Sequence, residues 1–521
     1  MPSAYSGKRK SDGGLLFPGI FPGVGLKFSL GMFRFLLEVM MPESRKYESF
    51  RDVLRSLGKT QSILNLPVVC IQGLGHVGSA MAAAVASARD ADGNPVYNVI
   101  GVDLEGKKVD AINAGKLPVA CTDAKFAAAV ASSSELGNLV AVSSPDAYAL
   151  ASVIVVDVPF DVSDLHGEPA LSFGIFRKAI RSIGEFAMPG TLVLVETTVP
   201  PGTCEMVVKP DLAACLRKRG LPEDSLLVAH SYERVMPGPD YFESITRFWR
   251  VFAGQTRDAG DAAADFLTKV IATDEFPLTR LRDTTASETA KVLENSYRAV
   301  TIAFAEEWGR FAESVGIDLF EVIRAVRVRP THSNMRQPGF GVGGYCLTKD
   351  PLMAKLASKD LFNLKGMDFP FCTQAVRINQ AMPLVSLDYV EKELLGLSGK
   401  KILLLGVSYR SDVGDTRYSP SETFVREAML RGAHVDCHDP LVTHWEEMDL
   451  DLPGPIPSPA RYHAVVFAVN HREYLEIDMA RWLEGATPLV FDANCVLDEK
   501  QRQAAKVAKC VVRSVGRGVG L

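Results

Sequence analysis

A cysteine stands at the end of a glycine-rich stretch, in the segment GFGVGGYCLTKDP at residues 339–351. We expect Cys346 to open a helix, where backbone amides at the helix N-terminus would stabilise its thiolate. The glycines of the stretch, including Gly343 and Gly344, would let a substrate approach the backbone closely. The segment therefore predicts a reactive thiol, and a structural cysteine beside a tight turn is the alternative.

A second glycine pattern, GLGHVG at residues 73–78, lies between a predicted buried strand over Leu66–Gln72 and an alanine-rich helix. In this context Gly73 permits a tight turn, Gly75 lets the backbone approach a pyrophosphate, and Gly78 lets the helix pack against the strand. The helix N-terminus attracts the anion. The pattern predicts a dinucleotide site, and a glycine-rich turn without a nucleotide is the alternative.

The second predicted strand, Tyr97–Asp103, ends in an acid. Asp103 can accept hydrogen bonds from ribose hydroxyls, which favours NAD over NADP as the cofactor. Lys107 and Lys108 follow closely in the sequence, so NADP stays open. The residues expected at the cofactor from this half of the chain are Gly73, Gly75, His76, Val77, Gly78 and Asp103.

Predicted strands and helices alternate along both halves of the chain. In the first half, further strands are predicted near 139–142, 153–158, 191–196 and 226–230. After residue 399 the alternation restarts, with strands at 434–437, 464–469 and 489–492. Between the halves, one long helical stretch over 286–315 has no proline, and a further helix over 376–389 contains Pro383. The fold class is therefore α/β: two Rossmann-like lobes with parallel sheets, joined by a long central helix and a helical connector.

The 521 residues carry a formal net charge of -5, with basic and acidic residues mixed along the chain. No basic tract suggests a nucleic-acid groove, so we expect no nucleic-acid partner. The nine cysteines are scattered without a CxxC pair, so neither a metal site nor a disulfide framework is predicted. This cysteine usage favours a reducing, cytoplasmic compartment.

The N-terminal region imitates a signal peptide, because a basic triplet at residues 8–10 precedes an apolar stretch over 15–41. Two prolines and three charged residues interrupt that stretch, and no small-residue cleavage site follows it. We therefore expect neither export nor an integral membrane span. An amphipathic helix is predicted over 28–41, docked on the protein or on a membrane surface.

Several segments, in order along the chain, resemble the UDP-glucose/GDP-mannose dehydrogenase family of nucleotide-sugar 6-dehydrogenases. The cysteine segment is similar to the family's GG-x-C-x-x-x-D pattern. The others are GLGHVG at 73–78, ETTVPPGT at 196–203, ERVMPG at 233–238, Lys291 to Asn295 in the long helix, and YRSDVGDTRYSP at 409–420. After an extension over 1–62, the resemblance implies an NAD-binding domain over 63–280, a central helical dimerisation domain over 281–390, and a UDP-sugar-binding domain over 391–521.

The resemblance implies oxidation of a sugar CH2OH to a carboxylate in two NAD-dependent steps, with Cys346 carrying a thiohemiacetal and then a thioester. Lys291 and Asn295 lie four residues apart on one helix face and suit a developing oxyanion; a solvated lysine and a packing asparagine are the alternative. Asp350, one turn after the cysteine, would order the catalytic water, unless it only stabilises the start of a helix. Glu196, at a strand end, would activate water or contact the nicotinamide ribose.

Further basic residues are implied at the cofactor and the substrate. Lys349 is expected to reach the cofactor, and Arg417 resembles an arginine that approaches NAD from the second lobe. Arg410 stands where the family usually has a lysine, and a guanidinium offers bidentate phosphate contact where lysine offers a point charge. Arg336, just before the glycine loop, is a candidate for sugar or diphosphate contact or an ordinary loop residue. The resemblance also implies a UDP-sugar substrate and a homodimer.

Two departures from the family pattern limit the assignment of the sugar. VPFD at residues 158–161 replaces the usual V-x-T-P, so Phe160 stands where a threonine would help to hold the catalytic water. Tyr345 replaces the serine typical of UDP-glucose enzymes and the histidine common in UDP-hexosaminuronate enzymes. The elements PPGT and VGG slightly favour the UDP-N-acetylhexosamine branch of the family, and UDP-glucose is the alternative substrate. The competing interpretations are a one-step hydroxyacid-type dehydrogenase and a non-catalytic nucleotide-sugar-binding protein.

Overall fold

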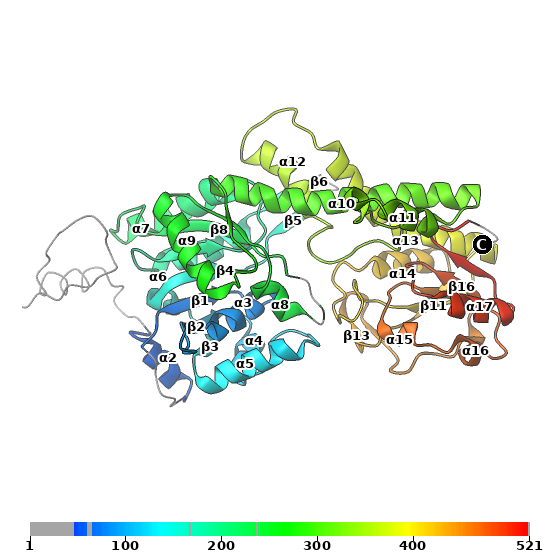
Figure 1. Ribbon diagram of the computed structural model, residues 1–521, viewed down its shortest axis with the longest axis horizontal. Coiled ribbons are helices and arrows are strands. Elements are labelled where there is room, and N and C mark those ends of the chain that lie inside the picture. The colour runs from blue at the N-terminus through cyan, green and yellow to red at the C-terminus, as the bar shows by residue number, and fades with distance from the viewer. Residues whose placement is uncertain (1–45, 60–64, 166–167, 236–237, 239, 519–521) are drawn as a thin grey trace, which may run out of the picture.

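Two α/β lobes are joined by long helices in the computed structural model, which describes residues 46–59, 65–165, 168–235, 238 and 240–518 (Figure 1). The amphipathic helix predicted over 28–41 lies outside these residues. The predicted fold class is confirmed, with mostly parallel sheets in both lobes and a long helix that runs along both of them. None of the described helices is long and apolar enough to cross a membrane.

The first lobe contains an eight-stranded sheet in the order β10-β9-β8-β7-β4-β1-β2-β3. All its pairings are parallel except β8 with β9. The inner strands are buried along most of their length because helices cover both faces of the sheet. The strands are β1 (Val68–Gln72), β2 (Asn98–Val102), β3 (Leu139–Val142), β4 (Ala151–Val156), β7 (Leu192–Val195), β8 (Leu227–Tyr232), β9 (Val251–Gly254) and β10 (Thr279–Arg280).

The helices of this lobe alternate with its strands, as predicted. They are α3 (His76–Ser87), α4 (Gly106–Asn113), α5 (Ala124–Leu136), α6 (Gly174–Phe186), α7 (Lys209–Lys218), α8 (Tyr241–Thr246) and α9 (Arg257–Val270). A further helix, α2 (Phe50–Ser56), precedes β1, and its buried residues Phe50, Val53 and Leu54 belong to the hydrophobic core beneath β1, β4 and β7. Part of the N-terminal region is therefore built into this lobe.

A hairpin that was not predicted follows β4. It consists of β5 (Asp161–Leu165) and β6 (Glu168–Ser172), which pair antiparallel outside the main sheet. The hairpin packs against α12 (Asp350–Asp360), the helix that follows the cysteine loop. It therefore links the first lobe to the central helices.

The central part of the molecule is built on α10 (Thr284–Val315) and α13 (Pro370–Leu394), which pack against each other. The side chain of Asp283 caps the first turn of α10, and Gly316, with a left-handed backbone, ends it. Both long helices were predicted; α13 extends beyond the predicted 376–389 at both ends, and Pro383 lies inside it. A shorter helix, α11 (Leu319–Arg327), follows α10.

The second lobe has a five-stranded parallel sheet in the order β12-β11-β15-β16-β17, as its strand–helix alternation predicted. Hydrophobic cores lie on both faces of it. Its elements are β11 (Lys401–Leu405), α14 (Pro420–Leu430), β12 (His434–His438), β13 (His444–Trp445), β14 (Leu450–Asp451), β15 (Ala464–Phe467), α15 (Arg472–Leu475), α16 (Met479–Trp482), β16 (Leu489–Asp492), α17 (Glu499–Val507) and β17 (Val512–Ser514).

Replacement of Gly78 by alanine should destabilise the first lobe. A Cβ atom there would lie 1.9 Å from the carbonyl oxygen of Gly73, because α3 crosses the end of β1 closely. We expect Gly78→Ala to cost about 1–3 kcal/mol, the usual range for overpacking. Gly106→Ala is the matched control, since a Cβ atom there meets nothing within 4 Å. Thermal unfolding should separate the two variants, and equal midpoints would contradict the packing argument.

Candidate active site between the two lobes

The cysteine loop ends in a turn, and the helix begins after it. The structure corrects the expectation that Cys346 opens a helix, because α12 begins at Asp350, one turn later. The backbone N–H groups of Lys349 and Asp350 donate to the carbonyl of Cys346 at 3.3 and 2.9 Å. The start of α12 therefore fixes the backbone of the cysteine.

The environment of the Cys346 thiol keeps it protonated near neutral pH. The residue is exposed to solvent, but it lies among the surrounding elements of both lobes. Burial among those atoms raises its pKa to about 11, and the Asp350 carboxylate also raises it, while Lys291 and Lys349 act in the opposite direction. An activated thiolate therefore requires a proton acceptor or added positive charge in the cleft.

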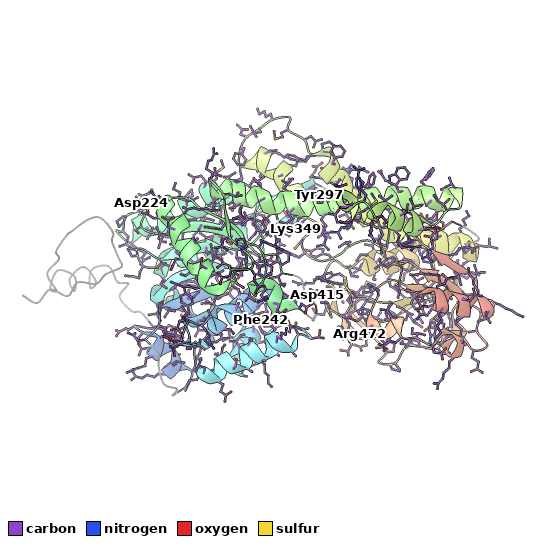
Figure 2. The ribbon with its side chains drawn as sticks, viewed as in Figure 1. Asp224, Phe242, Tyr297, Lys349, Asp415 and Arg472 are labelled. Carbon is purple, nitrogen blue, oxygen red and sulfur yellow. The ribbon has the colours of Figure 1, made fainter. Side chains whose placement is uncertain are left out.

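Asp350 is the buried centre of a polar chain. Its Oδ1 lies 2.8 Å from Nζ of Lys349, and its Oδ2 accepts a hydrogen bond of 2.8 Å from the Asn295 side chain. The Asp350 side chain is fully buried, and that of Lys349 is 9% exposed. Lys349 was expected at the cofactor, and its ammonium is bound here to Asp350. Lys349 lies in the region between the lobes, below α10 (Figure 2).

Lys291 is held by the segment that follows β8. Its Nζ donates to the carbonyl of Glu233 at 2.7 Å, lies 3.6 Å from that residue's carboxylate, and sits over the ring of Tyr232. Burial lowers the pKa of Lys291, but the carboxylates of Glu233, Asp350 and Glu294 and the thiol of Cys346 outweigh it, so the net direction is upward. The structure therefore brings a charged Lys291, Asn295 and Asp350 together around the cysteine.

Glu196 lies deeper than the sequence suggested. It is fully buried and forms an ion pair with Arg250, which is buried as well. Burial raises the pKa of Glu196, and it raises the pKa of the neighbouring Asp157 well above the usual range, with the Glu196 charge acting in the same direction. The sequence analysis did not single out Arg250 or Asp157. Asp157 fell inside the strand predicted near 153–158, whereas β4 ends at Val156 and leaves Asp157 directly after it.

The glycine pattern at the end of β1 fits a dinucleotide. Gly73 has a positive φ of 94°, and Gly75 is open, because a Cβ atom there would meet nothing within 4 Å. Among the described residues, no side chain caps the N-terminus of α3, so its first amides, including those of His76 and Val77, are available to an anion near Gly75. The carboxylate of Asp103 accepts from the backbone N–H of Leu74 at 2.6 Å, which ties the end of β2 to this turn.

The second lobe touches the glycine pattern through His76. Nε2 of His76 lies 3.4 Å from the Asp415 carboxylate, which is itself paired with the guanidinium of Arg417 at 2.7 Å. Burial lowers the pKa of His76, and the charge of Arg417 lowers it further. Asp415 lies between the lobes (Figure 2). A cavity of about 110 Å³ borders this contact and is lined from both lobes. Arg417 therefore lies near the glycine pattern through its ion pair with Asp415, and its contact with NAD stays a prediction.

The glycines before the cysteine pack against the second lobe. A Cβ atom on Gly343 would lie 2.4 Å from the carbonyl oxygen of Tyr418, and one on Gly344 would lie 2.9 Å from the Tyr409 ring. The backbone N–H of Gly344 donates to the carbonyl of Arg417 at 3.2 Å. These glycines were expected to admit a substrate; their open side is instead occupied by protein, and they fix the cysteine loop to the second lobe.

A cavity lined by arginines lies on the other side of the loop. Arg298, Arg327 and Arg336 line about 290 Å³ of space together with backbone of the cysteine loop. Burial lowers the pKa of Arg298, and the charges of Arg336 and Arg410 lower it further. The sequence analysis singled out Arg336 and Arg410, but not Arg298 or Arg327. The spacing could have indicated Arg298, because it follows Lys291 by seven residues and so lies on the same helix face.

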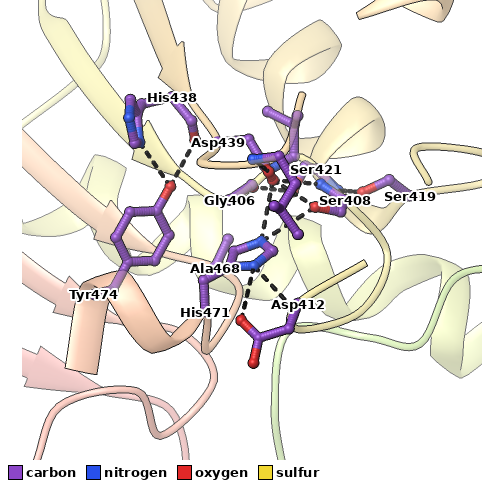
Figure 3. A network of polar contacts seen from close by, with 12 residues as sticks. Gly406, Ser408, Asp412, Ser419, Ser421, His438, Asp439, Ala468, His471 and Tyr474 are labelled. Atoms are coloured by element: carbon purple, nitrogen blue, oxygen red, sulfur yellow. Dashed lines mark hydrogen bonds and ion pairs between the residues drawn. The ribbon is translucent and has the colours of Figure 1, made fainter. Parts of the chain in front are cut away.

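A buried polar network lies in the second lobe, and Figure 3 shows Ser408, Asp412, Asp439 and His471 among its members. Oδ2 of Asp439 accepts from the hydroxyl of Ser408 at 2.5 Å and from the backbone N–H of Val407 and Ser408, and it lies 3.1 Å from Nε2 of His471. Nδ1 of His471 accepts the backbone N–H of Asp412 at 3.0 Å. The network therefore fixes the backbone on both sides of Arg410.

Comparison with known proteins supplies the family. Three domain models of the UDP-glucose/GDP-mannose dehydrogenase family match: the NAD binding domain over 68–269, the central domain over 285–381 and the UDP binding domain over 403–499. The chain belongs to this family. It is an NAD-dependent UDP-sugar dehydrogenase, an oxidoreductase that acts on a CH–OH group, and NAD is its cofactor.

Individual relatives support the same assignment. A UDP-N-acetyl-D-mannosamine dehydrogenase of Methanocaldococcus jannaschii is 30% identical over 371 residues, which are 71% of this chain and 78% of that protein. An NDP-N-acetyl-D-galactosaminuronic acid dehydrogenase of Ralstonia nicotianae is 28% identical over 428 residues, 80% of this chain and 94% of that protein. The solved structure of a UDP-D-ManNAc dehydrogenase from Pyrococcus horikoshii has a TM-score of 0.72 at 25% identity, over 86% of this chain and 99% of that one.

The network around Asp439 should make the stability of this dehydrogenase depend on pH. Burial raises the pKa of Asp439, but the hydrogen bonds from His471 and Ser408 lower it more, to about 2. A carboxylate whose folded pKa lies below its unfolded value, about 4, stabilises the fold above pH 4 and loses that contribution as the pH falls towards 2. We expect Asp439→Asn to lose about 2 kcal/mol near pH 7.

Urea unfolding of the two proteins at pH 7 and at lower pH measures this difference, which should shrink as the pH falls below 4. Asp436→Asn on the same strand is the control, because Asp436 is exposed and accepts one hydrogen bond, from Tyr462. A difference between wild type and Asp439→Asn that does not change with pH would contradict the assignment.

Proposed function

We propose that this enzyme oxidises C6 of a UDP-N-acetylhexosamine to the uronate, with UDP-N-acetyl-D-mannosamine as the first candidate, through a thioester on Cys346. The observation that carries the proposal is the loop over 339–346, which lines the arginine cavity at its start and presents the thiol at its end. A diphosphate held by the arginines would leave the attached sugar beside the thiol. The names of the relatives from M. jannaschii and R. nicotianae support an N-acetylated sugar.

The proposed chemistry removes four electrons from one carbon. Loss of a hydride from C6 and a proton from its hydroxyl gives an aldehyde, to which Sγ of Cys346 adds while its proton passes to the new hydroxyl. Loss of a second hydride and a proton gives a thioester. Water then attacks C6, the C6–Sγ bond breaks, the thiol regains a proton, and the carboxylate is released. NAD, when bound, supplies the hydride acceptor for both oxidations.

The charged groups around the thiol suit these steps. The Lys291 ammonium is raised in pKa and therefore stays charged, which suits the stabilisation of negative charge on the C6 oxygen. Asn295 donates to Asp350, so its role is to orient that carboxylate beside the cysteine. Asp350 is the proposed partner for the hydrolytic water, and the deeply buried Glu196, paired with Arg250, supports the nicotinamide end of the cleft.

The arginine cavity suits the substrate's diphosphate. Guanidinium groups offer planar, bidentate contacts to phosphate and remain charged at all working pH values. Arg298 lies close enough to Arg336, Arg410 and Cys346 for their charges to influence it, so it connects the diphosphate site to the reacting carbon. A one-step hydroxyacid dehydrogenase would need neither this cavity nor the second lobe. A non-catalytic binding protein would need no thiol with Lys291 and Asp350 beside it.

We propose a homodimer formed through the outer face of α10. Six apolar side chains, each 48–65% exposed, follow that helix at spacings of three, four and seven residues, and they are Leu293, Tyr297, Phe304, Trp308, Phe311 and Val315. These spacings place them on one face. A continuous exposed apolar stripe marks an interface, and a helix paired with its own copy gives the self-complementary contact of a two-fold dimer.

We also propose a cytoplasmic location and no nucleic-acid partner. All nine cysteines are free in the structure, which suits a reducing compartment. The net charge of -5 offers no long-range attraction to a polyanion beyond the local arginine cavity.

The proposed reaction predicts two NADH for each uronate formed. A panel of UDP-N-acetylmannosamine, UDP-N-acetylglucosamine, UDP-glucose and GDP-mannose should give the highest kcat/KM with an N-acetylated UDP-sugar. Cys346→Ala should lose at least about 1,000-fold in uronate formation, because covalent capture is removed. A yield of one NADH per product, or normal turnover of Cys346→Ala, would rule out the thioester route.

Arg298→Ala should raise KM about tenfold, roughly the 1.4 kcal/mol expected for one lost phosphate contact. Arg324→Ala is the matched control, because Arg324 is exposed on α11 and does not line the cavity. An equal effect of both substitutions would show that general charge, not the cavity, attracts the substrate.

Trp308→Glu should convert the dimer to monomers, because it places a charge in the centre of the apolar stripe on α10. Light scattering with size-exclusion chromatography measures the mass, and the chain mass is 56.6 kDa. Leu430→Glu is the control, since Leu430 is an equally apolar, 81% exposed residue on α14 in the other lobe. A wild-type protein that runs as a monomer at micromolar concentration would refute the interface.

A further inference from the structure

The two departures from the family pattern touch each other in the folded protein. Asp161 stands at the end of VPFD, where the usual pattern has proline, and Tyr345 stands directly before the cysteine. The hydroxyl of Tyr345 donates a hydrogen bond to Oδ1 of Asp161. The catalytic loop is therefore tied to the first strand of the β5–β6 hairpin by two residues that both differ from the family pattern.

Phe160 does not take over the role of the missing threonine. Its side chain is 1% exposed and packs edge-to-face on Phe173 and Phe176 in the core of the first lobe. The next residue, Asp161, is polar, and its carboxylate accepts from the hydroxyl of Tyr345. That carboxylate acts on the cysteine loop through Tyr345.

The ring of Tyr345 carries the next contact. Nζ of Lys349 lies 4.3 Å from the centre of the ring, within the range of a cation–π interaction. The same ammonium is 2.8 Å from Asp350, whose other oxygen accepts from Asn295. One continuous chain thus runs from Asp161 through Tyr345 and Lys349 to the buried Asp350 beside Cys346.

We propose that Tyr345 is a positioning residue: anchored to Asp161 by its hydroxyl, it holds Lys349 against Asp350 with the face of its ring and so sets the charge around the Cys346 thiol. The inference rests on the proposed role of Cys346 as nucleophile. Lys349 has a long, flexible side chain, and the ring removes its freedom to swing towards solvent. Held in place, the ammonium offsets a carboxylate that would otherwise disfavour the thiolate.

Charged and titratable groups face the thiol from every element around it. Asp350 and Lys349 belong to the start of α12, Lys291 and Arg298 to α10, Glu233 to the segment after β8, and Tyr409 to the second lobe. Of these, Lys349 is the one whose position depends on Tyr345. Loss of the ring should therefore raise the pKa of Cys346, and the effect should be traceable to Lys349.

Alkylation of Cys346 by iodoacetamide tests this in the full-length enzyme without substrate or cofactor. The rate at the Cys346 peptide at pH 8, followed by mass spectrometry, is proportional to the thiolate fraction, because pH 8 lies far below the thiol pKa of about 11 and lysine side chains are charged there. We expect Tyr345→Leu to slow alkylation about three- to tenfold, the change that corresponds to a rise in the thiol pKa of about half a unit to one unit. Tyr345→Phe is the matched control, because it keeps the ring. Asp161→Ala should behave like Tyr345→Phe, because both remove the same hydrogen bond, and each should slow alkylation less than about twofold.

Lys349→Met leaves Tyr345 in place and should slow alkylation at pH 8 at least as much as Tyr345→Leu. In the Lys349→Met background, Tyr345→Leu should cause no further slowing, because the ring then has no ammonium to hold. The proposal is overturned if Tyr345→Leu slows alkylation no more than Tyr345→Phe does, or if its effect persists without Lys349. Alkylation needs no turnover. Its result can therefore be interpreted even if Cys346→Ala shows that the enzyme does not work through a thioester.

Discussion

The contact between the cysteine loop and the second lobe is the constraint on which the rest of the site depends. Gly343 and Gly344 lie so close to Tyr418 and Tyr409 that no side chain fits between them, and the Gly344 amide is bonded to the second lobe. The thiol is therefore carried by a loop whose position follows that lobe, while Lys291 and Asn295 stand on α10. A relative movement of the two parts would change the distance between the nucleophile and the groups that stabilise its products.

Charge compensation explains how such a site can be stable before any ligand is present. Asp350 and Glu196 are fully buried, and each has a cationic partner, Lys349 or Arg250. Burial of an unpaired charge costs several kcal/mol, so the pairs are needed merely to keep the carboxylates in place. The thiol has no such partner of its own and stays protonated. The fold therefore stabilises the two buried carboxylates before any ligand binds, whereas the thiol loses its proton only during the reaction.

The sequence was sufficient for the parts of the molecule that local patterns encode. The turn at Gly73–Gly78, the long α10 and the second parallel sheet each follow from residue periodicity and turn chemistry within a short window. The β5–β6 hairpin was not predicted, because its strands pair outside the main sheet and are only partly buried. The start of α12 was misplaced by one turn, since the proline at 351 fits the first turn of a helix beginning at either point.

The site residues divide in the same way. Cys346, Lys291, Asn295 and Asp350 came from motif spacing and resemblance, and the structure brings them together. Arg250 and Arg327 carry no local signal, because their importance arises only when distant elements meet. Tyr345 shows the intermediate case. The sequence singled out Tyr345 because a tyrosine at this position departs from the family pattern. Its partner Asp161 could not be identified in the same way, because it is 184 positions away. The meaning of a departure at a motif position is therefore a question of tertiary contact: the half-buried tyrosine at 345 has a structural role because a carboxylate stands at 161 to accept from its hydroxyl.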